Sequence, residues 1–395
     1  MSLYLDEDLI WYRAATLTER LVVGPLPYAT EPLAEDDLAR YRWQSWKSQP
    51  PFDDETVFAQ RLALDGLTEM QLHHLVAEPV ATLGARFSEP PAWLHDLRAA
   101  LAQPFTSDFR QLLSDKLPRK PALGFLHAAA PFIEYALARF DAGGAALTAN
   151  AATLPFDPAT IKQLCFANLP KDLLDILNRT MALELNIARL SGELEGATPE
   201  ARFQNFIERL RQPERVLALL REYPVLARLL SEQAQRWVTI SLEFLTRLCR
   251  DWEAIKVTFA AEPGVLVAVK GGLTDTQRGG RTIFILKFSS GFQLVYKPRP
   301  LAVDVHFQEL LQWMHERGAN PPFPLLGVLH REQYGWLEFV QAHECETVEE
   351  VRRFYRRQGG YIALLYLIDA TDFHSANLIA GGEHPYLIEI GRAHV

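Results

Sequence analysis

The most informative segment of this sequence is Thr371-Asp372-Phe373-His374-Ser375-Ala376-Asn377-Leu378-Ile379. It follows an apolar run at 361–368 and precedes two short runs with the pattern of strands. Asp372 is suited to accept the proton of a substrate hydroxyl, Asn377 to bind magnesium through its amide oxygen, and His374 to polarise a phosphate or hold the loop. The alternative is a polar turn between a helix and a strand, because these residue types recur at this spacing by chance.

A glycine-rich segment and a lysine at the end of a strand lie upstream. Residues 271–280 are Gly-Gly-Leu-Thr-Asp-Thr-Gln-Arg-Gly-Gly, and backbone N–H groups there can approach phosphates closely because glycine has no Cβ. Lys297 ends an apolar run, and a strand lysine can reach nucleotide phosphates as a point charge. A simple turn and a solvated lysine are the alternatives for these two features. Glu309, on the helix expected next, is either a partner for Lys297 or a solvent-facing residue.

The order of the expected elements favours the phosphate-binding interpretation. Strands are expected at 282–288 and 292–297, a helix at 305–317, a hairpin at 325–330 and 336–340 that turns at Tyr334-Gly335, a helix at 347–369, and final strands at 377–380 and 386–390. A glycine-rich loop, a strand ending in lysine, a helix, a hairpin, a second helix and a polar loop before a hairpin form the layout of a kinase.

The first two thirds of the chain predict helices joined by proline-rich turns. One helix is expected at 36–47 and helical structure at 53–78, interrupted at Gly66. Another helix is expected to start after Thr198, which can cap it, with Pro199 in the first turn. Aromatic and aliphatic stripes at helical spacing are interpreted as core packing. These stripes comprise Phe203, Phe206, Ile207, Leu210, Trp237, Ile240, Phe244 and Leu248.

Composition narrows the function classes. A chain of 395 residues has room for two or three domains, and its net charge of −9 argues against a broad nucleic-acid or anionic-membrane surface. Cys165, Cys249 and Cys345 form no closely spaced pair, so neither a disulfide framework nor a structural zinc site is expected. The first residues lack a signal-peptide pattern and the longest apolar run is too short for a bilayer, so a cytoplasmic location is expected.

Further motifs surround the polar loop. Val-Tyr-Lys-Pro-Arg stands at 295–299, Tyr-Gly-Trp-Leu-Glu-Phe-Val at 334–340, Arg-Gln-Gly at 357–359, and Glu-Tyr-Pro-Val-Leu-Ala-Arg at 222–228. The polar loop and its hairpin resemble the catalytic and metal-binding segments of phosphoinositide-3-kinase-type lipid kinases. Together, from about residue 10 to about residue 389, the motifs resemble the dehydratase domain of class II (LanM-type) lanthipeptide synthetases.

This resemblance implies an α+β fold, with a helix-rich N-terminal region and a lipid-kinase-like core whose C-lobe is incomplete. The expected parts are a mainly helical region at 1–255, a kinase-like N-lobe at 256–341, the start of the C-lobe at 342–389 and a non-native tail at 390–395.

The resemblance also implies a two-step reaction. With ATP and Mg²⁺, such an enzyme phosphorylates Ser and Thr in a precursor peptide that carries a leader sequence, then eliminates the phosphate to give dehydroalanine and dehydrobutyrine. Neither a nucleic-acid partner nor membrane insertion is implied, and Zn²⁺ would belong only to a cyclase domain outside this chain. Carried over by motif, the ATP-binding and catalytic residues are Lys297, Asp372 and His374, the phosphate loop holds Asp275, Gly279 and Gly280, and the metal position includes Asn377.

Two positions depart from the family pattern. Gln277 stands where the family usually has His, and Glu389 stands where it has its metal-binding Asp. The tail from Ile390 matches the translation of a common sequencing adaptor, and one nucleotide of an Asp codon joined to that adaptor would encode Glu. We therefore hypothesise that residues from Glu389 onward are adaptor read-through on a truncated gene, and that the fragment itself is inactive. Re-amplification of the locus tests this, and a natural stop after Val395 would contradict it.

Two other functions stay open on the sequence alone. One is a stand-alone lipid or small-molecule kinase, which would leave a phosphorylated product without loss of water. The other is a non-catalytic pseudoenzyme that binds nucleotide or peptide, and whose nucleotide binding would not depend on magnesium.

Overall fold

The computed structural model describes residues 9–23, 37–103, 121–151, 153–271, 280–371 and 373–388. The chain forms two compact units. The helical unit contains residues 1–111, 115–138 and 170–237, and the sheet unit contains residues 112–114, 139–169 and 238–395. Helices dominate the first unit and an antiparallel sheet is the centre of the second, so the predicted α+β class is confirmed.

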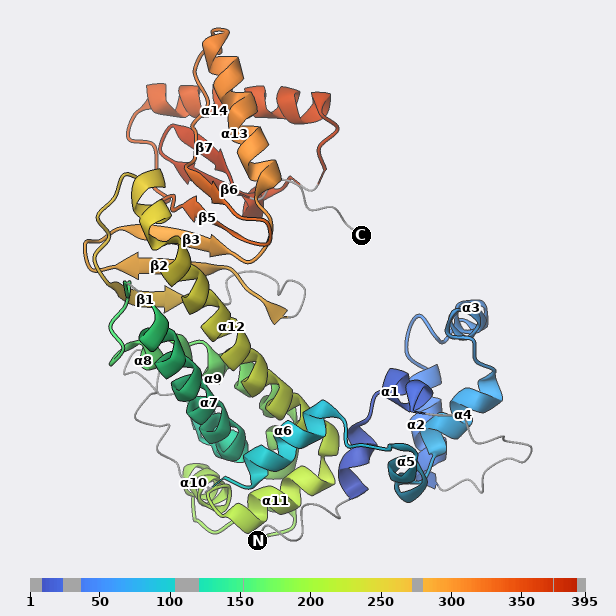
Figure 1. The fold of residues 1–395 in the computed structure, drawn as a ribbon. Helices are drawn as coiled ribbons and strands as arrows, with labels where there is room; N and C mark the ends of the chain where they lie inside the picture. The colour runs from blue at the N-terminus through green and yellow to red at the C-terminus, as the bar shows by residue number, and fades with distance from the viewer. Residues whose placement is uncertain are drawn as a thin grey trace. The chain divides into compact units, whose positions relative to one another are not determined.

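The helical unit is built from short helices with strong local start signals (Figure 1). Thr68 and Gln71 form a capping box at the start of α4, and Gly66 takes the left-handed conformation (φ +67°) that ends α3. The predicted interruption at Gly66 is therefore confirmed. The elements that lie wholly within this unit are η2 (Leu9–Ala14), α1 (Leu17–Val22), α2 (Asp37–Lys47), α3 (Glu55–Asp65), α4 (Glu69–Ala77), α5 (Val80–Arg86), α6 (Ala92–Leu101), η4 (Pro121–Ala129), α10 (Pro199–Arg209) and α11 (Pro213–Glu222).

The predicted start after Thr198 is also confirmed. The Thr198 hydroxyl accepts a hydrogen bond from the Ala201 N–H at 3.1 Å, and Pro199 is the first residue of α10. Phe206 and Ile207 are buried, as the packing interpretation requires. Three longer helices have residues in both units: α7 (Ala130–Asn150), α9 (Leu169–Leu190) and α12 (Pro224–Thr258).

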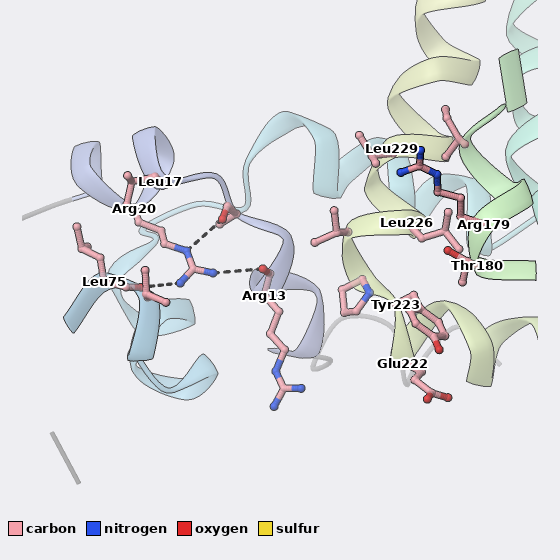
Figure 2. Close-up of a pocket in the computed structure, with 15 residues that line it drawn as sticks. Arg13, Leu17, Arg20, Leu75, Arg179, Thr180, Glu222, Tyr223, Leu226 and Leu229 are labelled. Atoms are coloured by element: carbon pink, nitrogen blue, oxygen red, sulfur yellow. Dashed lines mark hydrogen bonds between the residues drawn. The ribbon is translucent and has the colours of Figure 1, made fainter. Parts of the chain in front are cut away.

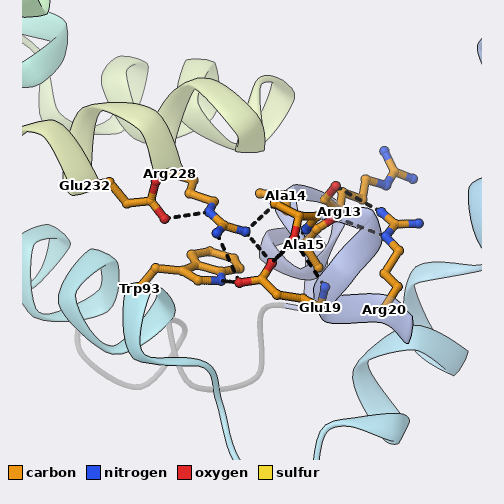
Figure 3. Close-up of polar contacts among 9 residues, drawn as sticks. Arg13, Ala14, Ala15, Glu19, Arg20, Trp93, Arg228 and Glu232 are labelled. Atoms are coloured by element: carbon orange, nitrogen blue, oxygen red, sulfur yellow. Dashed lines mark hydrogen bonds and ion pairs between the residues drawn. The ribbon is translucent and has the colours of Figure 1, made fainter. Parts of the chain in front are cut away.

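A charged cluster holds three helices of the helical unit together (Figure 3). Arg228 on α12 donates to both carboxylate oxygens of Glu19 at 2.5 and 3.0 Å and to Glu232 at 2.8 Å. Its guanidinium lies 4.5 Å from the ring centroid of Trp93 on α6, and the Trp93 indole donates to Glu19 at 3.0 Å. Burial raises the pKa of Glu19, but hydrogen bonds from Arg228 and Thr16 outweigh it and lower the pKa overall.

The sheet unit contains a five-stranded antiparallel sheet in the order β1-β2-β3-β5-β4. A separate two-stranded hairpin, β6–β7, follows α14. Their bounds are β1 (Leu266–Lys270), β2 (Phe284–Phe288), β3 (Gln293–Lys297), β4 (Val328–His330), β5 (Gly335–Glu338), β6 (Leu378–Gly381) and β7 (His384–Leu387), and the remaining helices of the unit are α8 (Ile161–Phe166), α13 (Ala302–Glu316), η6 (Ser375–Asn377) and α14 (Val348–Leu367).

Two hydrophobic groups form the core of the sheet unit. Phe244 of α12 packs against Phe284, Tyr296 and Trp336 of the sheet, with ring centroids 5.1 to 6.5 Å apart. The second group joins α13, α14 and β7, which lie beside one another in Figure 1. It consists of Phe307, Leu311, Phe323, Tyr361, Leu364 and Leu387.

The second predicted hairpin forms, and its turn lies between His330 and Gly335. Of the two residues predicted at the turn, Tyr334 lies in it and is buried, and Gly335 is the first residue of β5. Asp251 on α12 is 2% exposed and accepts hydrogen bonds from the Tyr334 hydroxyl at 2.7 Å and the Trp336 indole at 2.9 Å. Arg331 adds an ion pair to Asp251 at 2.9 Å. A buried carboxylate needs such partners.

In the described part of the chain, no helix is long and apolar enough to cross a membrane. Cys165 is buried, and Cys249 and Cys345 are partly buried. Burial raises the pKa of the Cys165 thiol to about 12 and that of Cys249 to about 11, so both are protonated at neutral pH.

Candidate functional site

Lys297, the last residue of β3, is buried with 2% of its surface exposed. Its backbone pairs with Gly335 of β5, which keeps the end of the strand inside the sheet. The Lys297 ammonium donates to the backbone carbonyl of Ile388 and lies 3.7 Å from a carboxylate oxygen of Asp304. The solvated-lysine alternative is therefore excluded. A buried ammonium among oxygen atoms is a fixed positive charge.

Asp304, in the first turn of α13, is the carboxylate that accompanies Lys297. It is 2% exposed, and Arg299 donates to its two oxygens at 2.9 and 3.4 Å. Glu309, the partner considered from the sequence, instead lies 2.8 Å from a ring nitrogen of His306, and its side chain is 66% exposed. The sequence offered one signal for Asp304: an acidic residue in a first helical turn, where the helix dipole favours negative charge.

The polar loop is joined to Lys297 through the backbone of Ile388. The Ile388 N–H donates to the carbonyl of Asn377 at 3.0 Å, while the Ile388 carbonyl accepts from Lys297. Asn377 is 5% exposed, and its own N–H donates to the carbonyl of His374 at 2.9 Å, which closes the η6 turn. His374 is exposed. Asp372 lies outside the described residues.

The ends of the glycine-rich segment are anchored in the sheet unit. The Gly271 N–H donates to the side chain of Asn168 at 3.0 Å, and Arg281 donates to Glu243 at 2.9 and 3.1 Å. Gly280 has a φ of +73°, a conformation that side chains other than glycine rarely adopt. Asp275 and Gly279 lie outside the described residues, so their expected role as a phosphate loop stays a prediction.

Two arginines of α14 hold the β6–β7 turn. Arg357, which is buried, donates to the Pro322 carbonyl at 2.7 Å and to the backbone and carboxylate of Glu383 at 2.8 Å each. Arg353 donates to the same carboxylate at 2.5 and 3.0 Å. Hydrogen bonds from Arg353 and then Arg357 lower the pKa of Glu383 to about 2. The hairpin that begins with Asn377 and Leu378 is thus fixed at its far end.

The described acidic and histidine side chains do not form a metal site by themselves. Within the described ranges, no group of three or more His, Cys, Asp or Glu side chains could hold a metal ion. Asn377 is described, whereas Asp372 and Glu389, the two acidic positions of the predicted site, are not. The magnesium site stays a prediction.

Comparison with known proteins gives two matches. Residues 223–391 match a family model described as a domain of unknown function (DUF4135). Over 247 residues, the chain is 26% identical to the "Lacticin 481/lactococcin biosynthesis protein LcnDR2" of Lactococcus lactis subsp. lactis. Both matches support the resemblance of this chain to class II lanthipeptide synthetases. The match covers 60% of this chain and 27% of the length of the Lactococcus protein, so the chain spans about a quarter of that relative's length.

Proposed function

We propose that this chain carries the nucleotide-binding part of a lanthipeptide synthetase that dehydrates a precursor peptide in two steps. ATP would first phosphorylate a Ser or Thr side chain, and the phosphate would then be eliminated. The observation that supports it best is the link from Lys297 through the backbone of Ile388 to Asn377. It joins a buried cation at a strand end to the polar loop, as phosphoryl transfer requires.

In the proposed first step the residues have two roles, neutralisation of phosphate charge and proton transfer. Lys297 would neutralise phosphate oxygens of ATP. The hydroxyl oxygen of the peptide would attack the γ-phosphorus, ADP would leave, and Asp372 would accept the hydroxyl proton. His374 would contact the phosphates at the exposed edge of the loop. In the second step a base removes the α proton of the phosphorylated residue and inorganic phosphate leaves, and we assign no residue of this chain to it.

Magnesium would be held through Asn377 together with the acidic position 389, and it would supply further neutralisation of phosphate charge. The fit rests on Asn377, whose amide belongs to a buried residue on the turn nearest Ile388. Oxygen ligands of this kind are those that magnesium prefers.

A lipid-kinase-like core is the fold that we propose for residues 256–389, divided into lobes at residue 341, with the helical region at 1–255 before it. The order of elements supports it: β1 and β2 flank the glycine-rich segment, β3 ends in Lys297, and α13, the β4–β5 hairpin, α14, η6 and the β6–β7 hairpin follow.

Nucleotide binding tests the proposal directly. We expect the chain to bind ATP in the presence of Mg²⁺, and Lys297→Met to weaken that binding about tenfold or more, because a charged hydrogen bond to phosphate is lost. Titration calorimetry measures both affinities. Lys287→Met is the matched control, since Lys287 is an exposed lysine on the neighbouring strand β2.

Two outcomes would contradict the proposal. Equal ATP affinity for Lys297→Met and the unchanged chain would remove Lys297 from the site. Binding of the same strength with and without Mg²⁺ would indicate a non-catalytic nucleotide-binding scaffold. For a chain extended to the full length of its relatives, mass spectrometry of a Ser/Thr-rich peptide should show loss of water, whereas a stable phosphopeptide would indicate a kinase alone.

A further inference from the structure

The helical unit contains a pocket of about 620 Å³ that none of the residues proposed for phosphate chemistry lines. Its walls come from η2, α1 and α4 on one side and from α9, α12 and the end of α11 on the other. Figure 2 shows Leu17, Arg20 and Leu75 on the first wall and Thr180, Leu226 and Leu229 on the second. The volume falls in the range of binding sites for small molecules or for a short peptide segment.

Most of the side chains that line the pocket are apolar. Val225 and Leu229 of α12 are 54% and 45% exposed, although they lie between buried neighbours such as Leu226 and Ala227. When a ligand covers exposed aliphatic groups in a concave site, the free energy of the system falls, so binding is favoured. The apolar residues of the lining are Ala15, Leu17, Leu75, Val76, Ile176, Pro224, Val225, Leu226 and Leu229.

The charged residues of the lining are predominantly basic. The lining contains three arginines, Arg13, Arg20 and Arg179, and a single carboxylate, Glu222. Arg20 is held in place by donating to the carbonyls of Ala15 at 3.0 Å, Leu75 at 2.7 Å and Arg13 at 3.2 Å (Figure 2). Arg13 and Arg179 are exposed, and neither pairs with a carboxylate among the described residues. In a chain of net charge −9, this local excess of positive charge favours an anionic ligand.

An apolar track along α9 extends the pocket. Ile176 and Thr180 line the pocket, and Leu183, Ile187 and Leu190 continue on the same helix face at spacings of three and four residues. These last three side chains are 51%, 44% and 76% exposed. At 1.5 Å per residue the track is about 20 Å long, which suits an elongated partner better than a compact molecule.

We propose that the pocket and the α9 track bind an acidic amphipathic peptide segment, with its apolar side chains against the leucines and isoleucines and its carboxylates toward Arg13 and Arg179. Helix-in-groove recognition has these requirements: aliphatic anchors at helical spacing and complementary charge at the rim. The inference depends on the proposed function only for the origin of the segment, which would be part of the peptide substrate.

A designed peptide tests this without nucleotide or catalysis. The probe is a fluorescein-labelled helix of about 15 residues, with leucines at helical spacing and glutamates flanking them, and a reference probe carries Gln at each Glu. Fluorescence anisotropy should show binding of the acidic probe and much weaker binding of the Gln probe. The double variant Arg13→Glu/Arg179→Glu should bind the acidic probe about tenfold less tightly, and Ile187→Gln several-fold less tightly.

Arg189→Glu is the matched control. Arg189 is exposed on α9 but lies on the face opposite the track, so its charge reversal should leave the affinity unchanged. Equal affinities for the Glu and Gln probes, or an equal loss for Arg189→Glu and the double variant, would overturn the proposal. If the chain bound dodecanoate but did not bind the peptide probe, the proposal would be overturned as well. Because nucleotide titration measures the Lys297 site separately, failure here does not count against the proposed phosphate chemistry.

Discussion

Lys297 shows how a buried charged side chain depends on its charged neighbours. Its ammonium lies 3.7 Å from Asp304, which also accepts two hydrogen bonds from Arg299. Neither carboxylate nor ammonium is exposed, so each reduces the cost of burying the other. Lys297 was found from the sequence because it ends a strand before Pro-Arg. Asp304 was missed, since Glu309 occupies an equally plausible position on the same helix.

We expect Asp304→Asn to lower the free energy of unfolding by about 3 kcal/mol, because removing one partner leaves a buried ammonium without its nearest carboxylate. It should also weaken ATP binding, since Lys297 would no longer be held in position. Urea denaturation and nucleotide titration measure the two effects. Glu309→Gln is the control on the same helix, where the exposed pair with His306 should contribute little. A stability unchanged by Asp304→Asn would contradict the assignment.

At the scale of elements, the sequence predicted most of the helices and strands but few of the side-chain bonds that join them. Gly66, Thr198 and the helix at 347–369 were found because caps and periodicity are local signals. The bond from the hydroxyl of Tyr334 to Asp251 was not predicted, because Asp251 lies 83 residues away. The same reason hid the clamp on Glu383, whose arginine partners lie 26 and 30 residues upstream. Short-range patterns contain no information on such partners.

The bonds of Arg353 and Arg357 to Glu383, called here the Glu383 clamp, should make the free energy of unfolding depend on pH. Because the folded pKa is about 2, below the ordinary value of 4.5, the carboxylate stabilises the fold above pH 4.5 and loses this effect as the pH falls toward 2. We expect Glu383→Gln to lower the unfolding free energy by about 1–2 kcal/mol at pH 7, where charged hydrogen bonds are lost. Thermal unfolding at several pH values should show this gap closing in acid.

A variant on α14 separates the clamp from general surface charge. Glu349→Gln removes an exposed pair with Arg352, and it should change stability little at any pH. If the difference between Glu383→Gln and the unchanged chain were the same at pH 3 and pH 7, the carboxylate would not be the source of the clamp.

At the scale of the whole molecule, each unit has its own polar anchor on α12. Arg228 serves the helical unit, where it bonds Glu19, Glu232 and the carbonyl of Ala14, and Asp251 serves the sheet unit. The motif at 222–228 ends at Arg228, yet its bonds to Glu19 and Ala14 could not be inferred, because these two residues lie more than two hundred residues away in the sequence.

We expect Arg228→Ala to destabilise the helical unit by about 3 kcal/mol, since it removes several charged hydrogen bonds and the contact with Trp93. Hydrogen exchange of residues 9–23 should rise, because Glu19 and Ala14 lose their anchor. Exchange in β2 and β3 of the sheet unit is the internal reference. Arg236→Ala, on the same helix and bonded to Gln233, should change neither region. Equal exchange in residues 9–23 for both variants would refute the anchoring role of Arg228.

The bonds of Ile388 have a consequence for which mutations the site tolerates. Lys297 and Asn377 are both held by main-chain atoms of this residue, its carbonyl and its N–H. Codon changes that exchange Ile388 for another aliphatic residue therefore leave both bonds intact, whereas a change to proline deletes the N–H donor. Genetic variation at position 388 would be limited by backbone chemistry more than by side-chain identity, because no atom of the isoleucine side chain makes these bonds.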